Sequence, residues 1–296
     1  EVVFPQHQGA AVMQFASDVL RAGVSLHMRE QGVRVLVEAD DNYLINPGRE
    51  VMERQGWGMR IGEGAFTREG HRAIVRRADG VIVTTPYLAD RYRKVNPNVY
   101  VCPNGVDPAD WPEPVKPDDG VLRIGWVASQ SHEIDMPLIG RAMRWASEQP
   151  GVEVTCVGLN PRESGKMAHR WWFRFGHVRW LHDLDAYRDT FRRFDIGVAP
   201  LLTSSQHSMG RSDIKAAEYS MGLVCPVVQD AAPYAAWTDG ENCLKARDDR
   251  DWLRVIKHLV ARPEEARQLA AAAREYVLAE RTAEAQVGLW REAIEG

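Results

Sequence analysis

Cysteines are scarce in this chain, and the spacings that give them chemistry are missing. Among 296 residues there are 4 cysteines, with no C-x-x-C pair and no Cys/His zinc spacing. They lie far apart and mostly inside apolar runs, so disulfide frameworks and zinc modules are disfavoured. We expect buried free thiols at Cys102, Cys156, Cys225 and Cys243.

Long apolar runs and an excess of one charge are also missing. No apolar run reaches the ~18 residues that a membrane-spanning helix needs, and no signal segment is recognisable at the start. We therefore expect a cytoplasmic protein. The formal net charge is only −4, without gross asymmetry along the chain, which argues against a general polyanion-binding surface.

Several enzyme signatures are absent as well. No G-x-G-x-x-G follows an apolar strand, and there is no G-x-x-x-x-G-K-[ST], G-x-S-x-G or H-E-x-x-H. Dehydrogenase, P-loop kinase, serine hydrolase and zincin functions lose support accordingly.

Apolar runs alternate with helical patterns through most of the chain, which is typical of βαβ units and parallel sheets. In the first part, runs at 33–37, 81–84 and 99–102 are separated by helical stretches that include residues 10–22 and 68–77. A polar segment rich in Pro and Asp follows Pro103 and predicts a linker near residue 115. We expect Rossmann-like domains at 1–115 and 116–280, facing a cleft, and a C-terminal helix at 281–296 that packs back toward the first domain.

The stretch from Phe194 to Gln229 carries most of the functional signal. It predicts a strand, a loop, a helix and a second strand, with cationic and hydroxyl side chains near the helix start. Helix N-termini favour phosphate, and Arg211 and Lys215, four residues apart, would share one helical face. Glu218 lies where it could accept hydrogen bonds from sugar hydroxyls. A surface ion pair between Lys215 and Glu218 is the alternative.

Two further strand ends carry candidate site residues. Ser129, Gln130 and Ser131 follow the apolar run at 122–127, where backbone N–H groups could face an anion, or where Ser131 could simply cap the next helix. Asp40 and Asp41 follow the run at 33–37. Their carboxylates could act as a base for an acceptor hydroxyl, orient it, hold a divalent ion, or form a solvated turn.

Residues 162–193 interleave arginines with aromatic side chains. Three interpretations stay open: stacking and phosphate contacts with a nucleic acid, an amphipathic insertion that packs on the second domain, or a flap for the acceptor. The side chains concerned are Arg170, Trp171, Trp172, Phe173, Arg174, Phe175, Arg179 and Trp180.

Three segments together resemble the glycosyl transferases group 1 family, which has the two-Rossmann GT-B architecture. The segment at 78–107, which ends in PNGVD, resembles the end of the family's first domain. Residues 122–139 resemble its second-domain opening, and 195–228, with E-Y-x-x-G-x-x-x-P-V-V, its donor region. The likeness spans roughly residues 33–290, with a shortened first domain.

The resemblance implies a glycosyltransferase that moves a sugar from a nucleotide-diphosphate sugar to an acceptor hydroxyl with retention. It implies no obligatory cofactor, and a divalent metal is not expected. Glu218 would hold the donor ribose, and the backbone at 181–183 would face the base. The expected donor-binding residues are Ser129, Gln130, Ser131, His182, Ser212, Asp213 and Glu218. The expected catalytic residues are Asp40, Asp41, Arg211 and Lys215.

The chain departs from the family at three places. Gly210 stands where the family's E-x7-E motif has its first glutamate, Ala39 replaces the active-site histidine, and the first phosphate loop lacks its usual Gly-Arg pair. Two alternatives therefore stay open: a non-catalytic module that binds nucleotide sugar or glycan, and a GT-B sugar-nucleotide epimerase. The acceptor (glycan, protein or modified nucleic acid) and the oligomeric state are not determined by the sequence.

Overall fold

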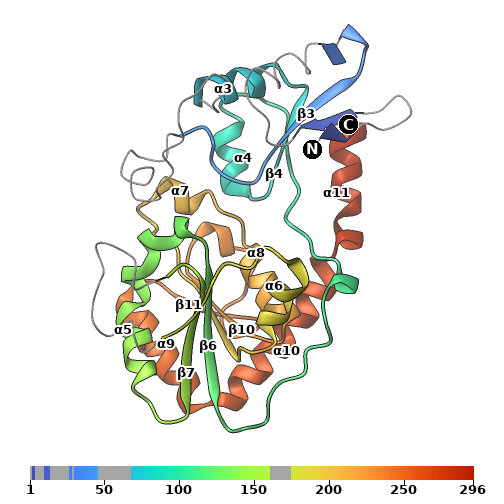
Figure 1. Cartoon of the computed structure of the whole chain (residues 1–296). Coiled ribbons are helices and arrows are strands. Elements are labelled where there is room, and N and C mark those ends of the chain that lie inside the picture. Colours follow the sequence, from blue (N-terminus) through green and yellow to red (C-terminus); the bar gives the residue numbers. More distant parts are fainter. Residues whose placement is uncertain (1, 4–9, 14–26, 29, 46–67, 161–174) are drawn as a thin grey trace. The chain divides into compact units, whose positions relative to one another are not determined.

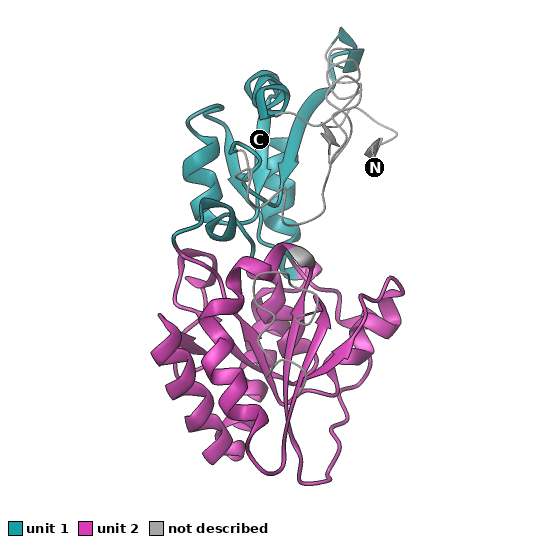
Figure 2. Ribbon diagram, turned by 60° about the vertical axis from the view of Figure 1, so that its left-hand side comes forward, with its two compact units in different colours: residues 1–104, 204–212, 285–296 teal, residues 105–203, 213–284 magenta. Residues whose placement is uncertain are grey.

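The computed structural model describes residues 2–3, 10–13, 27–28, 30–45, 68–160 and 175–296 (Figure 1). The chain divides into two compact units (Figure 2). Unit 1 comprises residues 1–104, 204–212 and 285–296, and unit 2 comprises residues 105–203 and 213–284. The chain thus leaves unit 2 and returns to it within the donor-like segment.

Unit 1 is built on a sheet with the order β1-β2-β3-β4-β5. Strand β1 is antiparallel to β2, whereas β2 to β5 run parallel. The strands are β1 (Val2–Val3), β2 (Ala10–Met13), β3 (Arg34–Ala39), β4 (Gly80–Val83) and β5 (Val99–Val101). The predicted helix over 10–22 is wrong at its start, because residues 10–13 pair with β3.

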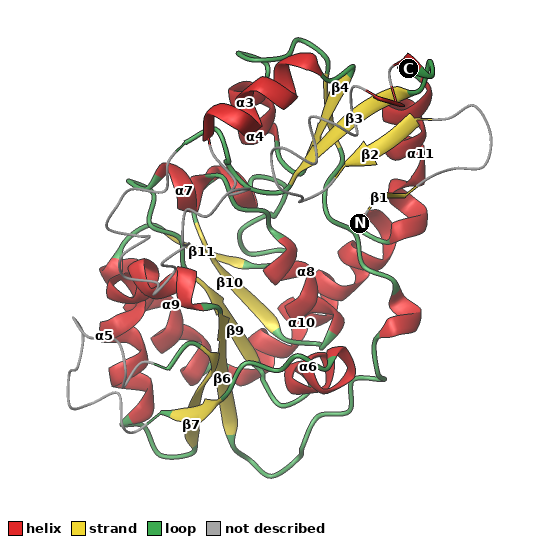
Figure 3. Ribbon diagram, turned by 45° about the horizontal axis from the view of Figure 1, so that its top comes forward, coloured by secondary structure: helices red, strands yellow, loops and turns green. Residues whose placement is uncertain are grey.

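Helices cover both faces of the unit 1 sheet (Figure 3). Alternate residues of a strand face opposite sides. Val35 and Val37 therefore pack toward α3 (Arg68–Arg77) and α4 (Pro86–Tyr92), as the cluster with Ile74 and Leu88 shows. On the other face, Leu36, Ile82 and Cys102 pack with Ala293 and Trp290 of α11 (Ala283–Glu295).

Unit 2 is built on a parallel sheet with the order β11-β10-β9-β6-β7-β8. The order is that of a dinucleotide-binding sheet, in which the strand order reverses between the two central strands, here β6 and β9. The strands are β6 (Leu122–Ala128), β7 (Val152–Gly158), β8 (Gly176–Val178), β9 (Ile196–Ala199), β10 (Cys225–Gln229) and β11 (Leu244–Ala246).

Unit 2 has two apolar layers, one on each face of its sheet. Ile124, Trp126 and Val198 pack toward α5 (Met136–Ser147) and α9 (Asp249–Ala261). The second layer lies on the opposite face, where Val127 and Val228 of the sheet pack with side chains of α6 (Leu184–Phe191), α8 (Ile214–Met221) and α10 (Pro263–Glu280). All four cysteines are buried and free, which confirms the prediction.

Tyr219 of α8 bridges β6 and β9 at the switch point of this sheet, where the two strands diverge. The two strands pair only through Ile124–Ile196 and Gly125–Gly197. Past that point the Tyr219 hydroxyl donates to the carbonyl oxygen of Val198 at 3.0 Å and accepts from the N–H of Val127 at 3.1 Å. A Cβ on Gly197 would lie 2.4 Å from the Tyr219 ring, so glycine is needed there. Tyr219 thereby fixes the place of α8 on the sheet.

Among the described residues, no helix is both long and apolar enough to cross a membrane.

Tyr219→Phe should lower the free energy of unfolding by about 1–3 kcal/mol, because it leaves a buried amide and a buried carbonyl without their partner. Urea denaturation measures this value. Tyr87→Phe is the matched control. Among the described residues, the Tyr87 hydroxyl has a hydrogen bond only from the Arg91 side chain, at 3.3 Å, and we expect a change below about 0.5 kcal/mol. Equal losses in both variants would contradict the proposed importance of the Tyr219 hydroxyl.

Candidate functional site

In parallel α/β sheets, ligands bind beyond the carboxyl ends of the strands at the switch point. In unit 2 this place is framed by the segments after β6 and β9. Asp135, fully buried, joins the two segments, because its Oδ1 accepts from the N–H of Leu202 at 2.7 Å and its Oδ2 lies 2.9 Å from His132 Nδ1. His132 thus has a structural partner, and the pair holds the edges of the site together.

The predicted anion loop lies at the end of β6. Ser129 precedes the 3-10 helix η2 (Gln130–Asp135) and makes no side-chain capping bond to it. The hydroxyls of Ser129 and Ser131 lie 2.7 Å apart, and both residues are partly exposed. Gln130 opens the same turn. The structure therefore brings the three predicted residues together at the switch point.

Lys215 and Glu218 lie on α8, which begins beside the same strand ends. The phenolic hydroxyl of Tyr187, on α6, donates to Glu218 Oε2 at 2.9 Å. Burial raises the pKa of Glu218, while the charge of Lys215 and the Tyr187 hydrogen bond oppose that shift. Tyr187 gave no sequence signal, since α6 carries no motif. Because the phenol occupies only one oxygen lone pair, the carboxylate keeps acceptor capacity for a ligand hydroxyl.

Asp213 has a different environment from the one expected of a ligand-contacting residue. It is buried, and its carboxylate accepts from both terminal nitrogens of Arg281 and from Trp237 Nε1 at 2.9 Å. Neither Arg281 nor Trp237 was a candidate on sequence grounds, because they lie 68 and 24 residues away along the chain.

The segment between β8 and α6 adds an aromatic surface near Tyr187. Trp180 is 43% exposed, and its ring centroid lies 6.0 Å from that of Tyr187. Gly158, at the end of β7 with φ +92°, lets the indole approach, since a Cβ there would lie 2.6 Å from the ring. The predicted residue His182 is exposed in the same segment.

Unit 1 gathers a second set of predicted residues after β3. Tyr43 donates to Asp40 Oδ1 at 2.6 Å. Burial raises the pKa of Asp41 to about 6; the Arg211 guanidinium opposes this shift, and Asp40 adds to it. A carboxyl with this pKa changes protonation near neutral pH, which suits acid–base chemistry.

Arg211 is oriented by a residue that sequence reasoning missed. Its Nη2 donates to Nε2 of His207 at 3.0 Å. Burial, together with Arg211 itself, lowers the pKa of His207 to about 4, so the imidazole is neutral and accepts this bond. His207 belongs to α7 (Gln206–Met209), a short helix without a recognisable motif.

The helical face expected to carry both Arg211 and Lys215 is not formed. Helix α8 begins at Ile214, so Arg211 precedes it and belongs to unit 1, whereas Lys215 belongs to unit 2. Ser212 also lies in unit 1, where its hydroxyl accepts from the side-chain amide of Asn104 at 2.9 Å.

The packing around Gly210 leaves no room for a glutamate at this position, where the E-x7-E motif would have its first glutamate. A Cβ on Gly210 would lie 2.6 Å from Cβ and 3.1 Å from the backbone nitrogen of Asn42. A side chain at 210 would therefore collide with the turn that presents Asp41.

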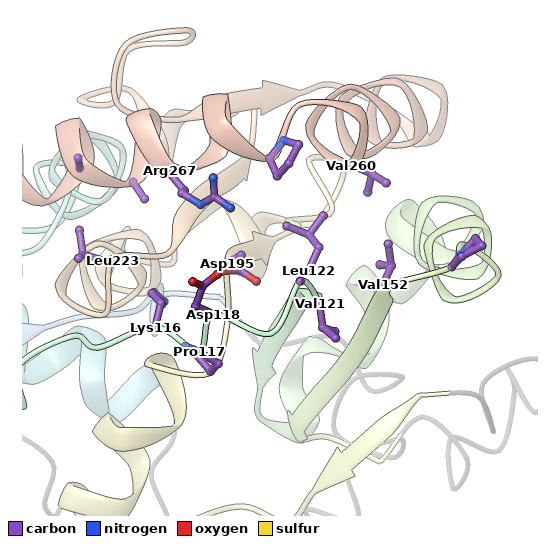
Figure 4. A pocket seen from close by; sticks show the side chains of 16 residues that line it. Lys116, Pro117, Asp118, Val121, Leu122, Val152, Asp195, Leu223, Val260 and Arg267 are labelled. Atoms are coloured by element: carbon purple, nitrogen blue, oxygen red, sulfur yellow. The ribbon is translucent and has the colours of Figure 1, made fainter.

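A cavity of about 780 Å³ lies at the opposite, amino-terminal end of the unit 2 strands (Figure 4). Lys116, Asp118, Asp195 and Arg267 contribute charged groups to its wall. The Lys116 ammonium donates to the carbonyl oxygen of Phe191, the last residue of α6, and to that of Phe194 beyond it, and burial lowers the pKa of Lys116 to about 8. None of the predicted site residues lines this cavity.

Two predictions concern parts that the structure covers incompletely. Outside the described residues lie Arg170, Trp171, Trp172, Phe173 and Arg174, whereas Phe175 is buried in the unit 2 core.

In the described part of the chain, no three His, Cys, Asp or Glu side chains gather so as to hold a metal ion.

Gly210→Ala should lower the free energy of unfolding by about 1–3 kcal/mol, because the new methyl group meets the Asn42 backbone and cannot be accommodated by a rotamer change. Gly288→Ala is the control, since a Cβ there meets nothing within 4 Å on α11 and should be neutral or stabilising by up to about 1 kcal/mol. Thermal unfolding compares the two variants. An unchanged Tm for Gly210→Ala would contradict the predicted collision, because the turn at Asn42 would then move aside at little cost in free energy.

The model of a family described as glycosyl transferase-like matches residues 140–291, more than half of the chain. A search of curated proteins found no match. The fold resembles sucrose-phosphate synthase from Thermosynechococcus elongatus with 19% identity and a TM-score of 0.63, covering 91% of this chain and 70% of that one.

Two other solved structures show the same fold. Anabaena Alr3699/HepE in complex with UDP-glucose has 12% identity and a TM-score of 0.65, covering 94% of this chain and 75% of that one. TarM has 15% identity and a TM-score of 0.59, covering 88% of this chain and 50% of that one. The two sheet-and-helix units have the GT-B architecture predicted from the sequence, and the chain belongs to the glycosyl transferase-like family.

Proposed function

We propose that this glycosyltransferase moves a sugar from a nucleoside-diphosphate sugar to an acceptor hydroxyl, with the donor held by unit 2. The observation that carries the proposal is the pair Lys215 and Glu218, which α8 presents beside the carboxyl ends of the unit 2 strands. A cation for the diphosphate and a carboxylate for the ribose lie one helical turn apart. The binding of UDP-glucose by HepE makes uridine nucleotides the first ligands to test.

The departing diphosphate needs its developing charge stabilised during transfer. Lys215 and the positive end of α8 supply that stabilisation in the proposal, while the turn at Ser129 and Ser131 contributes further hydrogen-bond donors. Glu218 fixes the ribose by accepting from its hydroxyls, and the Tyr187 hydrogen bond keeps the carboxylate oriented.

Unit 1 supplies the acceptor side in this proposal. Asp41, with its raised pKa, positions the acceptor hydroxyl or removes its proton, and Asp40 is held beside it by Tyr43. Arg211, oriented by His207, adds a positive charge close to Asp41. The resemblance to group 1 enzymes supports retention of configuration, which an NMR spectrum of the product's anomeric proton would test.

Lys215→Ala and Glu218→Gln should each weaken donor binding by about 10- to 100-fold, because a charge-assisted contact is worth roughly 1.5–3 kcal/mol. Calorimetric titration with UDP, GDP, ADP and dTDP sugars measures the affinity. Lys257→Ala is the matched control: Lys257 is exposed on α9 over the ring of Trp145, and its loss should leave the affinity unchanged.

The outcome separates three functions. Unchanged affinity in both variants would contradict a donor site on α8. Binding without release of nucleoside diphosphate, in the presence of varied acceptors, would indicate a binding module. An isomerised sugar nucleotide formed from donor alone would indicate an epimerase.

The rate of transfer should depend on the ionisation of Asp41. With a folded pKa of about 6, kcat/KM should fall about tenfold per pH unit below that value, as the carboxylate is protonated. The folded pKa exceeds the ordinary aspartate value of 3.8 that holds in the unfolded chain, so the folded state binds this proton more tightly, and Asp41 favours folding more as the pH falls from 6 toward 4.

Asp41→Asn should remove this acidic limb from the residual activity and should abolish the corresponding pH dependence of stability. A residual rate profile that still fell below pH 6 in the Asn variant would assign the titration to another group.

A further inference from the structure

Asp213 occupies the N-cap position of α8, yet its carboxylate makes no capping hydrogen bond. It is held instead in a buried network. Arg281 Nη2 donates to its Oδ1 at 2.7 Å, Arg281 Nη1 donates to its Oδ2, and Trp237 Nε1 donates to Oδ2 at 2.9 Å. The side chains of Asp213 and Arg281 are only 6% and 5% exposed.

This arrangement runs against the local preference of the chain. Aspartate is among the best N-cap residues, and a cap typically stabilises a helix by about 1 kcal/mol. Here the backbone of Asp213, with φ −90° and ψ 11°, lacks the extended conformation of a capping residue. A buried ion pair is also weak evidence for stability, because apolar replacements are often equally stable. The network therefore calls for an explanation other than stability.

Arg281 holds a particular place in the chain. It is the C-cap of α10, and its carbonyl oxygen accepts from the N–H of Val106 at 2.8 Å. Ala283 donates to the carbonyl of Val106 at 2.9 Å, so residues 281–283 run beside Val106 as a short parallel bridge. Trp237 also makes an edge-to-face contact with Tyr276 of α10, with 5.2 Å between the ring centroids. Arg281 is thus anchored through its backbone and cannot easily follow Asp213.

An anchored guanidinium that binds both carboxylate oxygens fixes where the negative charge of Asp213 lies. Released from Arg281, the carboxylate would sit one residue from the first turn of α8, and its usual partners are the N–H groups of that turn. There it would oppose the approach of a second anion, because both would compete for the same donors and the same positive helix end.

We propose that Asp213 and Arg281 are positioning residues that keep the Asp213 carboxylate away from the start of α8, so that the donor diphosphate can bind there. This assignment rests on the proposed function. The pair contacts no substrate; it acts by withholding the natural cap from the anion-binding end of the helix.

The test is a rescue. Arg281→Met releases the carboxylate and should weaken binding of the nucleoside diphosphate that the wild-type protein binds best by about tenfold. Arg281→Met combined with Asp213→Asn places a neutral amide at the same position and should restore the affinity to within about threefold of wild type. Thermal unfolding is measured in parallel, because a purely structural role predicts that affinity follows Tm and that the double variant binds no better than the single one.

Arg254→Met is the matched control, since Arg254 is exposed on α9 and pairs only with Asp251 among the described ion pairs. If the Met variants fail to fold, Arg281→Lys and Arg281→Lys/Asp213→Asn replace them, and the same order of affinities is expected. Full affinity in the single variant, or no recovery in the double variant, overturns the assignment while leaving the proposed function intact. Wild-type protein that binds none of UDP, GDP, ADP, CDP and dTDP overturns both.

Discussion

The hydroxyl group of Tyr219 is the contact on which the rest of unit 2 depends. Parallel strands that diverge at a switch point leave an amide and a carbonyl without partners, and Tyr219 satisfies both from outside the sheet. The ring also fills the space left by Gly197, so these contacts hold helix α8 in its position on the sheet. That position sets where Lys215 and Glu218 lie, so a packing constraint in the core determines the geometry of the candidate donor site.

Within each unit, neighbouring polar and charged side chains orient the proposed functional groups or shift their pKa. In unit 2, Tyr187 orients Glu218 from one side, and the Asp213–Arg281 pair removes a competing negative charge from the helix start. In unit 1, a neutral His207 orients Arg211, whose charge restrains the rise in the pKa of Asp41. Glu218, Arg211 and Asp40 each have a hydrogen-bond partner that sets the direction of the charged group, as sites that must be preorganised require.

The alternation of short strands and helices predicted the fold class because it depends on local periodicity, and the family likeness came from short local motifs. What the sequence concealed was non-local. Arg281 and Trp237 meet Asp213 only through the fold, and Tyr187 meets Glu218 across two helices. By sequence, residues 204–212 simply precede α8, yet they belong to unit 1, where Arg211 lies near Asp41. Glycine is needed at position 210 because Asn42 packs against it, and not because of the backbone conformation of Gly210. The prediction of a helix that begins at residue 10 failed for the same reason, since residues 10–13 pair with β3 and this pairing overrides their local helical pattern.

The central claim is that a nucleoside diphosphate binds at the carboxyl edge of the unit 2 sheet, at the start of α8. Hydrogen–deuterium exchange with and without saturating UDP, or the diphosphate that binds best, tests it most directly. The account predicts slowed exchange in the amides of residues 129–132 and 213–218, with little change around Lys116 and Arg267. Protection concentrated at the amino-terminal cavity that those two residues line, with none at α8, would contradict it.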